Sequence, residues 1–237
     1  MKSYGQFCPV AKAAELFCER WTALVLRSIA AGAHRFNAIH RGMPLMSATL
    51  LSRRLNELER EGIVTRTRSE TGQHWHYALS EAGAEFVPLV MALGKWGRRW
   101  TRRAPEEGEI DHGLLIWGLE HCVDGAAFGP ARVVVELHFT DQADARARAW
   151  FVNEGGAAEL CLTDPGHAVD LYLAASLRDM THLYRGDVSL TEACDSGRLE
   201  VIGPQGLRDR LGAWLNPGPL AGIAPAAVAP LSRAAGC

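Results

Sequence analysis

Residues 46–64, MSATLLSRRLNELEREGIV, combine polar and basic side chains of types that can bind nucleic acid with a hydrophobic seam. At 100° per residue, Leu51, Leu55 and Leu58 fall on one stripe of a helix. The opposite face carries polar side chains, namely Thr49, Ser52, Arg53, Asn56 and Arg60. In the major groove, an arginine can donate a bidentate pair of hydrogen bonds to guanine, and an asparagine can pair with adenine. This polar face could read DNA, or it could be the ordinary solvated face that any surface helix has. The elements that flank the helix decide between these two interpretations.

The residues before this helix predict further helices. Residues 9–31 are rich in helix formers and divide into two helices near Glu19–Arg20. Residues 34–44, HRFNAIHRGMP, predict a short helix that ends in a Gly and a Pro. Ser47 then stands where an N-cap belongs, and Gly62 ends the helix that it caps.

A basic hairpin is predicted directly after this helix. Residues 63–70, IVTRTRSE, alternate as a strand does, TG forms a turn, and residues 73–80, QHWHYALS, form a second strand. Ser80 can cap a last long helix over residues 81–103. This order, several helices followed by a basic hairpin and another helix, is that of a winged helix-turn-helix. In such a domain the recognition helix enters the major groove.

We therefore predict sequence-specific binding of duplex DNA, with hydroxyls bonding phosphates or bases and the hairpin following a neighbouring groove or the backbone. The candidate DNA-binding residues are Arg35, Ser47, Thr49, Ser52, Arg53, Asn56, Arg66, Arg68 and His74. His74 and His76 share one face of a strand and could bind a metal, but exposed polar surface is the simpler interpretation. No metal or cofactor is predicted.

The distribution of charge supports two regions with different partners. Residues 1–105 hold 16 basic and 8 acidic residues, whereas the remainder holds 9 basic and 19 acidic residues. A basic half is the electrostatic footprint of a polyanion binder. The alternative is that this surface charge serves only solubility.

The basic half resembles the HxlR-type winged-helix regulators of bacteria. The matching stretches are CPVAKAAELFCERWTALVLRSI, RFNAIHRGMPLMSATLLSRRLNELEREGIVTR, YALSEAG and the closing Trp100. The resemblance implies a dimeric transcriptional regulator, more commonly a repressor, that binds an inverted repeat. The hairpin departs from the family pattern, because SETGQHWHYAL replaces a segment that usually contains proline.

The last helix of this half suggests a dimer interface. Phe86, Leu89, Leu93, Trp96 and Trp100 repeat at spacings of 3, 4, 3 and 4, as in a coiled-coil seam. The alternative is that this stripe packs on its own domain. A two-fold dimer would present two recognition helices to half-sites about one helical turn apart.

The six cysteines are scattered without C-x-x-C pairs, so free thiols in a reducing compartment are expected. Cys8 precedes the first helix, at a position where HxlR-type regulators commonly carry a cysteine that some of them use as a sensor. A helix N-terminus can lower a thiol pKa and make it reactive. The other interpretation is a small buried residue.

The acidic half predicts an α+β layer structure. Helices are expected over residues 112–123, 176–187, 189–197 and 204–215, and strands over 131–139, 146–153, 158–163, 168–174 and 198–203. We place the DNA-binding domain at residues 1–104 and the α+β domain at residues 105–215. Residues 216–237, rich in Ala, Pro and Gly, are expected to form a flexible tail.

The stretch 169–215, VDLYLAASLRDMTHLYRGDVSLTEACDSGRLEVIGPQGLRDRLGAWL, resembles the sterol-carrier-protein-like fold. Relatives of that kind enclose an apolar tunnel, so the resemblance implies a pocket for an apolar small molecule. The candidate lining residues are Trp117, Leu137, Phe139, Phe151, Tyr172, Met180 and Tyr184. The alternative is that they form an ordinary closed core.

Several classes of protein are disfavoured. No apolar run is long enough to span a membrane, and the N-terminus does not read as a signal peptide, so a cytoplasmic protein is expected. The catalytic motifs G-x-S-x-G, H-E-x-x-H and G-x-G-x-x-G and the Walker loop are missing from the sequence, and we predict no enzyme.

Three functional hypotheses follow. The first is a dimeric transcriptional regulator whose C-terminal domain senses an apolar molecule. The second is a regulator switched by oxidation of Cys8, with a structural or dimerising second domain. The third is a lipid carrier or an enzyme that retains a DNA-binding fold.

Overall fold

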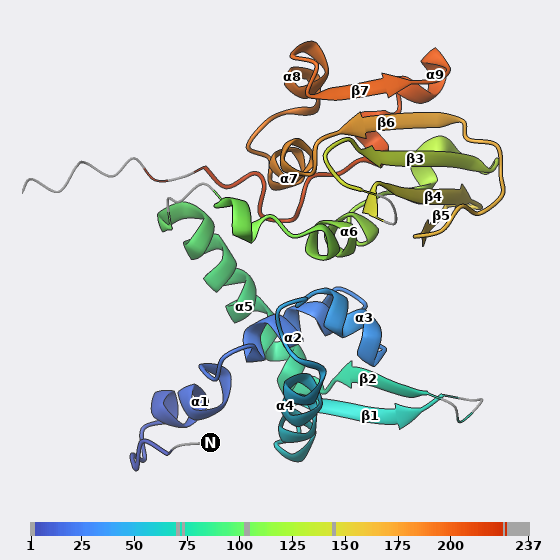
Figure 1. Ribbon diagram of the computed structural model, residues 1–237. Coiled ribbons are helices and arrows are strands. Elements are labelled where there is room, and N and C mark those ends of the chain that lie inside the picture. Colours follow the sequence, from blue (N-terminus) through green and yellow to red (C-terminus); the bar gives the residue numbers. More distant parts are fainter. Residues whose placement is uncertain are drawn as a thin grey trace, which may run out of the picture.

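The computed structural model describes residues 3–69, 72, 74–101, 105–143, 146–224 and 226. Two bodies, a helical one with a hairpin and one built on a sheet, are joined through the long helix α5 (Figure 1). The N-terminal body comprises α1 (Pro9–Phe17), α2 (Thr22–Ala30), α3 (Phe36–Arg41), α4 (Ala48–Arg60), β1 (Val64–Arg68), β2 (Trp75–Leu79) and α5 (Glu81–Trp100). This order confirms the predicted helices and hairpin.

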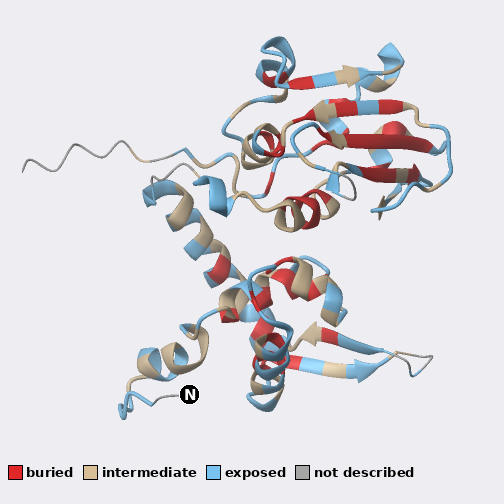
Figure 2. Cartoon of the chain, in the orientation of Figure 1, coloured by how far each residue is buried: buried red, intermediate tan, exposed pale blue. Residues whose placement is uncertain are grey.

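The leucine seam of α4 lies in the core of the N-terminal body. Leu51, Leu55 and Leu58 are fully buried, together with Val25 and Leu26 of α2. The buried side of α4 faces the other helices, whereas its outer side is exposed (Figure 2). Burial of these side chains, at about 1.5–3 kcal/mol each, orients α4 so that its polar face points to solvent.

The hairpin is an antiparallel pair, β1 with β2, in which Arg66 lies opposite Tyr77 and Arg68 opposite Trp75. Ser80 caps α5 as predicted, because its Oγ accepts a hydrogen bond from the Gly83 N–H. Residue 71 of the predicted turn, and residues 70 and 73 at the adjoining ends of the predicted strands, lie outside the described residues.

The C-terminal body is an α+β structure. Its elements are η1 (Glu107–Glu109), α6 (His112–Glu120), η2 (Gly125–Phe128), β3 (Val133–Phe139), β4 (Arg148–Glu154), β5 (Ala157–Cys161), β6 (Leu171–Ala175), α7 (Leu177–Arg185), α8 (Leu190–Asp195), β7 (Leu199–Ile202), α9 (Gln205–Arg208) and α10 (Leu211–Trp214). The five strands are ordered β5-β4-β3-β6-β7, and only the β3–β6 pair is parallel. The fold class is as predicted, but the single helix expected over 204–215 is two short helices.

The core of this body lies between one face of the sheet and the helices. Alternate residues of β3 point into it and meet α6, α7 and α10. Trp214 is fully buried, stacks on Phe128, and donates its indole N–H to Oδ1 of Asn153 at 2.7 Å. This packing on one side of the sheet explains the strong alternation that the sequence of β3 shows.

The segment after α10 returns toward the N-terminal body, although residues 216–237 are predicted to be a flexible tail. The Gly218 N–H donates to the Tyr184 carbonyl at 2.7 Å, and Ala226 N–H donates to the Arg99 carbonyl. The segment therefore runs past α7 to the end of α5 (Figure 1). Residues 225 and 227–237 lie outside the described residues. Within the described part of the chain, no helix is long and apolar enough to cross a membrane.

Candidate DNA-binding surface and inter-domain cavity

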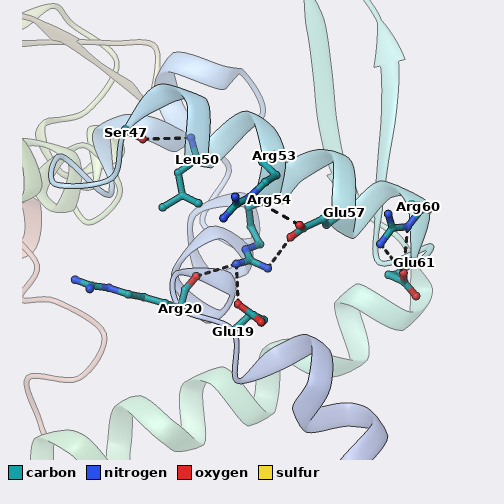
Figure 3. A network of polar contacts seen from close by, with 9 residues as sticks. All are labelled: Glu19, Arg20, Ser47, Leu50, Arg53, Arg54, Glu57, Arg60 and Glu61. Atoms are coloured by element: carbon teal, nitrogen blue, oxygen red, sulfur yellow. Dashed lines mark hydrogen bonds and ion pairs between the residues drawn. The ribbon is translucent and has the colours of Figure 1, made fainter. Parts of the chain in front are cut away.

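The exposed face of α4 gathers the predicted base-reading residues. Thr49, Ser52, Arg53 and Asn56 are all exposed on this one helix. Ser47 is the N-cap, and its Oγ accepts a hydrogen bond from the Leu50 N–H at 3.3 Å (Figure 3). The cap fixes the start of the helix, so the side chains of its first two turns project from a defined position.

Two adjacent arginines of α4 have opposite environments. Arg54 is 3% exposed and donates to Glu57 at 2.7 Å, to Glu19 at 3.2 Å and to the Arg20 carbonyl (Figure 3). Arg53 keeps 66% of its side chain exposed, and among the described residues its ion pair is a long one, 3.9 Å from Glu57. Arg54 therefore ties α4 to the turn between α1 and α2, whereas Arg53 remains available to a partner.

Trp75 organises the hairpin cations, a role that sequence analysis missed. The Arg66 and Arg68 guanidinium groups lie 4.4 and 4.9 Å from the Trp75 ring centroid, within cation–π range. Arg66 is also paired with Glu59 of α4 at 3.2 Å, so part of its charge is neutralised. Arg68 and the 40% exposed Trp75 therefore form the more available surface of the hairpin. The alternation of basic and aromatic residues across the strands was the signal for this arrangement.

The remaining candidates lie at the margins of this surface. Arg35 is exposed at the N-cap of α3, and His74 is exposed beside the turn of the hairpin. His76 does not join His74 in a cluster, because its ring stacks on His34 with 4.6 Å between centroids. Among the described residues, no group of three or more metal-ligating side chains is present.

The similarities to known proteins cover the N-terminal body. Residues 16–105 match the HxlR-like helix-turn-helix family. The HTH-type transcriptional regulator YvaP of Bacillus subtilis is 35% identical over 98 residues, which cover 40% of this chain and 91% of YvaP. The chain belongs to the HxlR-like helix-turn-helix family. A second relative, the HTH-type transcriptional regulator sll1512 of Synechocystis, is 32% identical over 100 residues, which cover 42% of this chain and 74% of that protein.

The reduced form of the transcriptional regulator YodB from B. subtilis is a similar solved structure. It is 31% identical, covers 39% of this chain and 92% of its own, and has a TM-score of 0.35. The family match ends at residue 105, so the C-terminal body lies beyond it. The likeness of that body to sterol carrier proteins stays a prediction.

The HxlR-like domain exposes most of the predicted dimer seam. Leu89, Leu93, Trp96 and Trp100 of α5 are between 46% and 60% exposed. Phe86 differs from the other four, because its ring stacks on Phe17 of α1 with 3.5 Å between centroids. The structure thus divides the stripe into one residue that packs within the domain and four that are open to a partner.

Cys8 is half-buried at the N-cap of α1, and its side chain does not cap the helix. Cys18, at the other end of α1, is exposed. The described cysteines are all free thiols. Cys8 can therefore be oxidised, as can the other described thiols, and the structure does not distinguish Cys8 from them.

The seven predicted lining residues do not surround one space. Leu137, Phe139, Phe151 and Met180 are packed in the core of the C-terminal body. Tyr172 is 43% exposed in a shallow hollow on the opposite face of the sheet, beside Glu136 and Glu200. Only Trp117 and Tyr184 line a large cavity, and it lies between the two bodies.

This inter-domain cavity has a volume of about 1360 Å³ and receives residues from both bodies. Its apolar wall includes Val87, Val90 and Met91 of α5, and Leu220 of the returning segment. Sequence reasoning missed it because its walls come from segments that are far apart along the chain.

Proposed function

We propose that this protein is a DNA-binding transcriptional regulator that reads base sequence with the exposed face of α4. The observation that carries the proposal is the pairing of a buried leucine seam with exposed Arg53 and Asn56 on one capped helix. Its location in an HxlR-like domain supports the proposal, since the relatives YvaP and sll1512 are HTH-type transcriptional regulators. Arg68 and Trp75 of the hairpin would contact the adjacent backbone or groove.

We also propose that the functional unit is a homodimer that binds an inverted repeat. The four exposed apolar residues of α5 support this, because apolar side chains at these spacings pack well against a second copy. A two-fold dimer would set its recognition helices roughly 34–36 Å apart, one turn of the duplex.

The test is selection of an operator from random duplexes with the full chain, followed by affinity measurements on operator and scrambled DNA. Arg53→Ala should reduce the preference for the operator by about 1–3 kcal/mol. Arg60→Ala is the matched control, since Arg60 has the same 66% side-chain exposure but lies in the last turn of α4. It should lower affinity for both duplexes alike.

Unchanged discrimination in Arg53→Ala would remove Arg53 from base reading. A wild-type protein without any sequence preference and with a shallow salt dependence would support a carrier or an enzyme instead.

The C-terminal body would supply the signal by binding an apolar small molecule. Support comes from the apolar cavity that its helices help to form. The alternative is a switch at Cys8, with a C-terminal body that is structural or dimerising. A Cys8→Ser variant that loses an oxidant response of operator binding would favour the thiol switch, whereas a retained response would exclude it.

A further inference from the structure

The inter-domain cavity contains one cation that stands apart from the others. The wall of the cavity includes three arginines, namely Arg27 of α2, Arg98 of α5 and Arg185 of α7. Arg98 and Arg185 both bind the Asp187 carboxylate, at 2.6 and 2.8 Å. Arg27 forms no ion pair with any carboxylate in the part of the chain that the structure describes, so its positive charge is balanced neither by Asp187 nor by another described acid.

Arg27 is held in a fixed position despite this missing counter-ion. Its Nη2 donates to the Gly42 carbonyl at 2.9 Å, and its guanidinium lies 4.7 Å from the centroid of the Trp117 ring. Its Nε has no hydrogen-bond partner among the described residues. The guanidinium is partly removed from water by the packing around it, and this burial lowers the pKa of Arg27. A poorly hydrated guanidinium with spare donors is a strong site for a carboxylate or another small anion.

The groups around Arg27 favour the same kind of ligand. The Trp117 indole N–H has no hydrogen-bond partner among the described residues, but it is buried beside Gly42 and is not open to the cavity, so Trp117 contributes the face of its ring, which covers the Arg27 guanidinium. Burial raises the pKa of Tyr184 to about 12, so its hydroxyl keeps its proton and adds no negative charge. The cavity therefore has the Arg27 cation and the neutral Tyr184 hydroxyl in its wall, with an apolar wall from α5 beside them.

We propose that this cavity binds a small molecule with an apolar body and a single anionic group, and that Arg27 recognises the anion. The inference rests on the proposed sensing of a small molecule and specifies both the site and the chemical class. A volume of about 1360 Å³ exceeds the roughly 300–1,000 Å³ of most ligand pockets, so a molecule of drug size fits.

The site also provides a route from ligand to DNA. Arg27 lies on α2, which packs against α5 in the DNA-binding body, whereas Trp117 and Tyr184 lie on α6 and α7. A ligand that touches both bodies binds best in one arrangement of the two. It can shift the position of the HxlR-like domain only by this difference in affinity between arrangements.

The test uses two probes with the same pyrene body and the same chain length, one ending in a carboxylate, 1-pyrenebutyrate, and one in a neutral hydroxyl, 1-pyrenebutanol, titrated into the full chain by calorimetry. The wild-type protein should bind the carboxylate at least about tenfold more tightly than the alcohol. Arg27→Gln should reduce this preference to within about threefold, and Arg27→Lys should keep most of it. Arg132→Gln is the control, because Arg132 lies outside the cavity and forms an exposed ion pair with Glu154 of β4.

Two further variants locate the probe. Met91→Trp narrows the cavity without changing Arg27, and it should weaken both probes by the same factor. Leu162→Asp alters an exposed apolar residue outside the cavity and should leave both affinities unchanged. Met91→Trp keeps the experiment informative if Arg27→Gln does not fold.

Equal affinity of the wild-type protein for the two probes would overturn the proposal, as would a preference that survives Arg27→Gln or probe affinities that Met91→Trp leaves unchanged. Operator selection without probes is a separate measurement. If operator selection fails while the charge preference holds, the site stands and the proposed regulator does not. If neither probe binds while an operator is selected, the DNA-binding function stands and the site is excluded.

Discussion

The two bodies of this protein use their side chains in opposite ways. In the HxlR-like domain, the residues with binding chemistry lie on the exposed face of a helix, and a buried leucine seam orients that helix. In the C-terminal body, the aromatic residues that could bind a ligand are mostly core, and the accessible chemistry lies where this body meets the other. The candidate DNA-binding surface is formed by one body alone. The cavity is lined by residues of both bodies, so a ligand bound there would contact both.

The contrast predicts that the two bodies unfold separately. Trp214→Ala removes the fully buried centre of the C-terminal core and its hydrogen bond to Asn153. We expect the C-terminal body to lose about 3–5 kcal/mol of stability while operator binding at low temperature persists. Calorimetry should show two transitions, with only one shifted in the variant. One transition that shifts as a whole would show that the bodies form a single cooperative unit.

Much of the DNA-binding surface follows from the sequence because helix periodicity separates its faces. Leu51, Leu55 and Leu58 define the buried side of α4, so the exposure of Arg53 and Asn56 on the other side follows directly. Ser47 and Ser80 mark helix starts because their hydroxyls accept backbone N–H groups that would otherwise lack partners.

Tertiary arrangement accounts for what the sequence does not show. The distance from Arg27 to Trp117 depends on how the bodies meet, and no local pattern encodes it. Periodicity also cannot tell that Phe86 packs on Phe17 while Leu89 stays exposed. Likewise, the strand alternation that places Leu137 and Phe139 on one face does not reveal whether that face is a tunnel or a filled core.

The adjacent arginines of α4 sharpen the contrast between structural and binding roles within one helix. Arg54→Met should cost about 3 kcal/mol of stability, because the variant leaves Glu19 and Glu57 without their buried partner. Arg53→Met should change stability by less than about 0.5 kcal/mol, since its side chain is mostly exposed. Urea unfolding of both variants measures the difference. Similar losses in the two variants would contradict these assigned roles.

The apolar face of α5 should hold two copies together. Leu93→Asp places a charge in the middle of this face, and we expect it to weaken dimerisation at least about tenfold, near 1.4 kcal/mol. Leu162→Asp is the control, because Leu162 is 47% exposed in the C-terminal body. Sedimentation equilibrium distinguishes them. A wild-type monomer, or equal effects of the two variants, would place the interface elsewhere or remove it.

The smallest expected effect on stability comes from an ion pair between the two bodies. It joins Arg98 of α5 to Asp187, which follows α7. Burial acts to raise the pKa of Asp187, but hydrogen bonds from Arg185, Arg98 and His182 outweigh it and lower the pKa from 3.8 to about 2. A folded-state pKa below the unfolded value means that charged Asp187 stabilises the folded protein above about pH 3.8. That contribution is lost as the pH falls from there toward 2.

Asp187→Asn should therefore destabilise the protein at about pH 6 by less than roughly 1 kcal/mol, since the group is partly exposed, and hardly at all near pH 2. Urea unfolding at both pH values measures this, with Glu154→Gln as the control for an exposed ion pair within one body. If Asp187→Asn alone also weakens the preference for 1-pyrenebutyrate, the ion pair helps to hold the bodies in the arrangement that binds the ligand. If the destabilisation by Asp187→Asn instead grew as the pH fell, the assigned direction of the Asp187 pKa shift would be wrong. The stabilising role given to the Arg98–Asp187 ion pair would then be wrong as well.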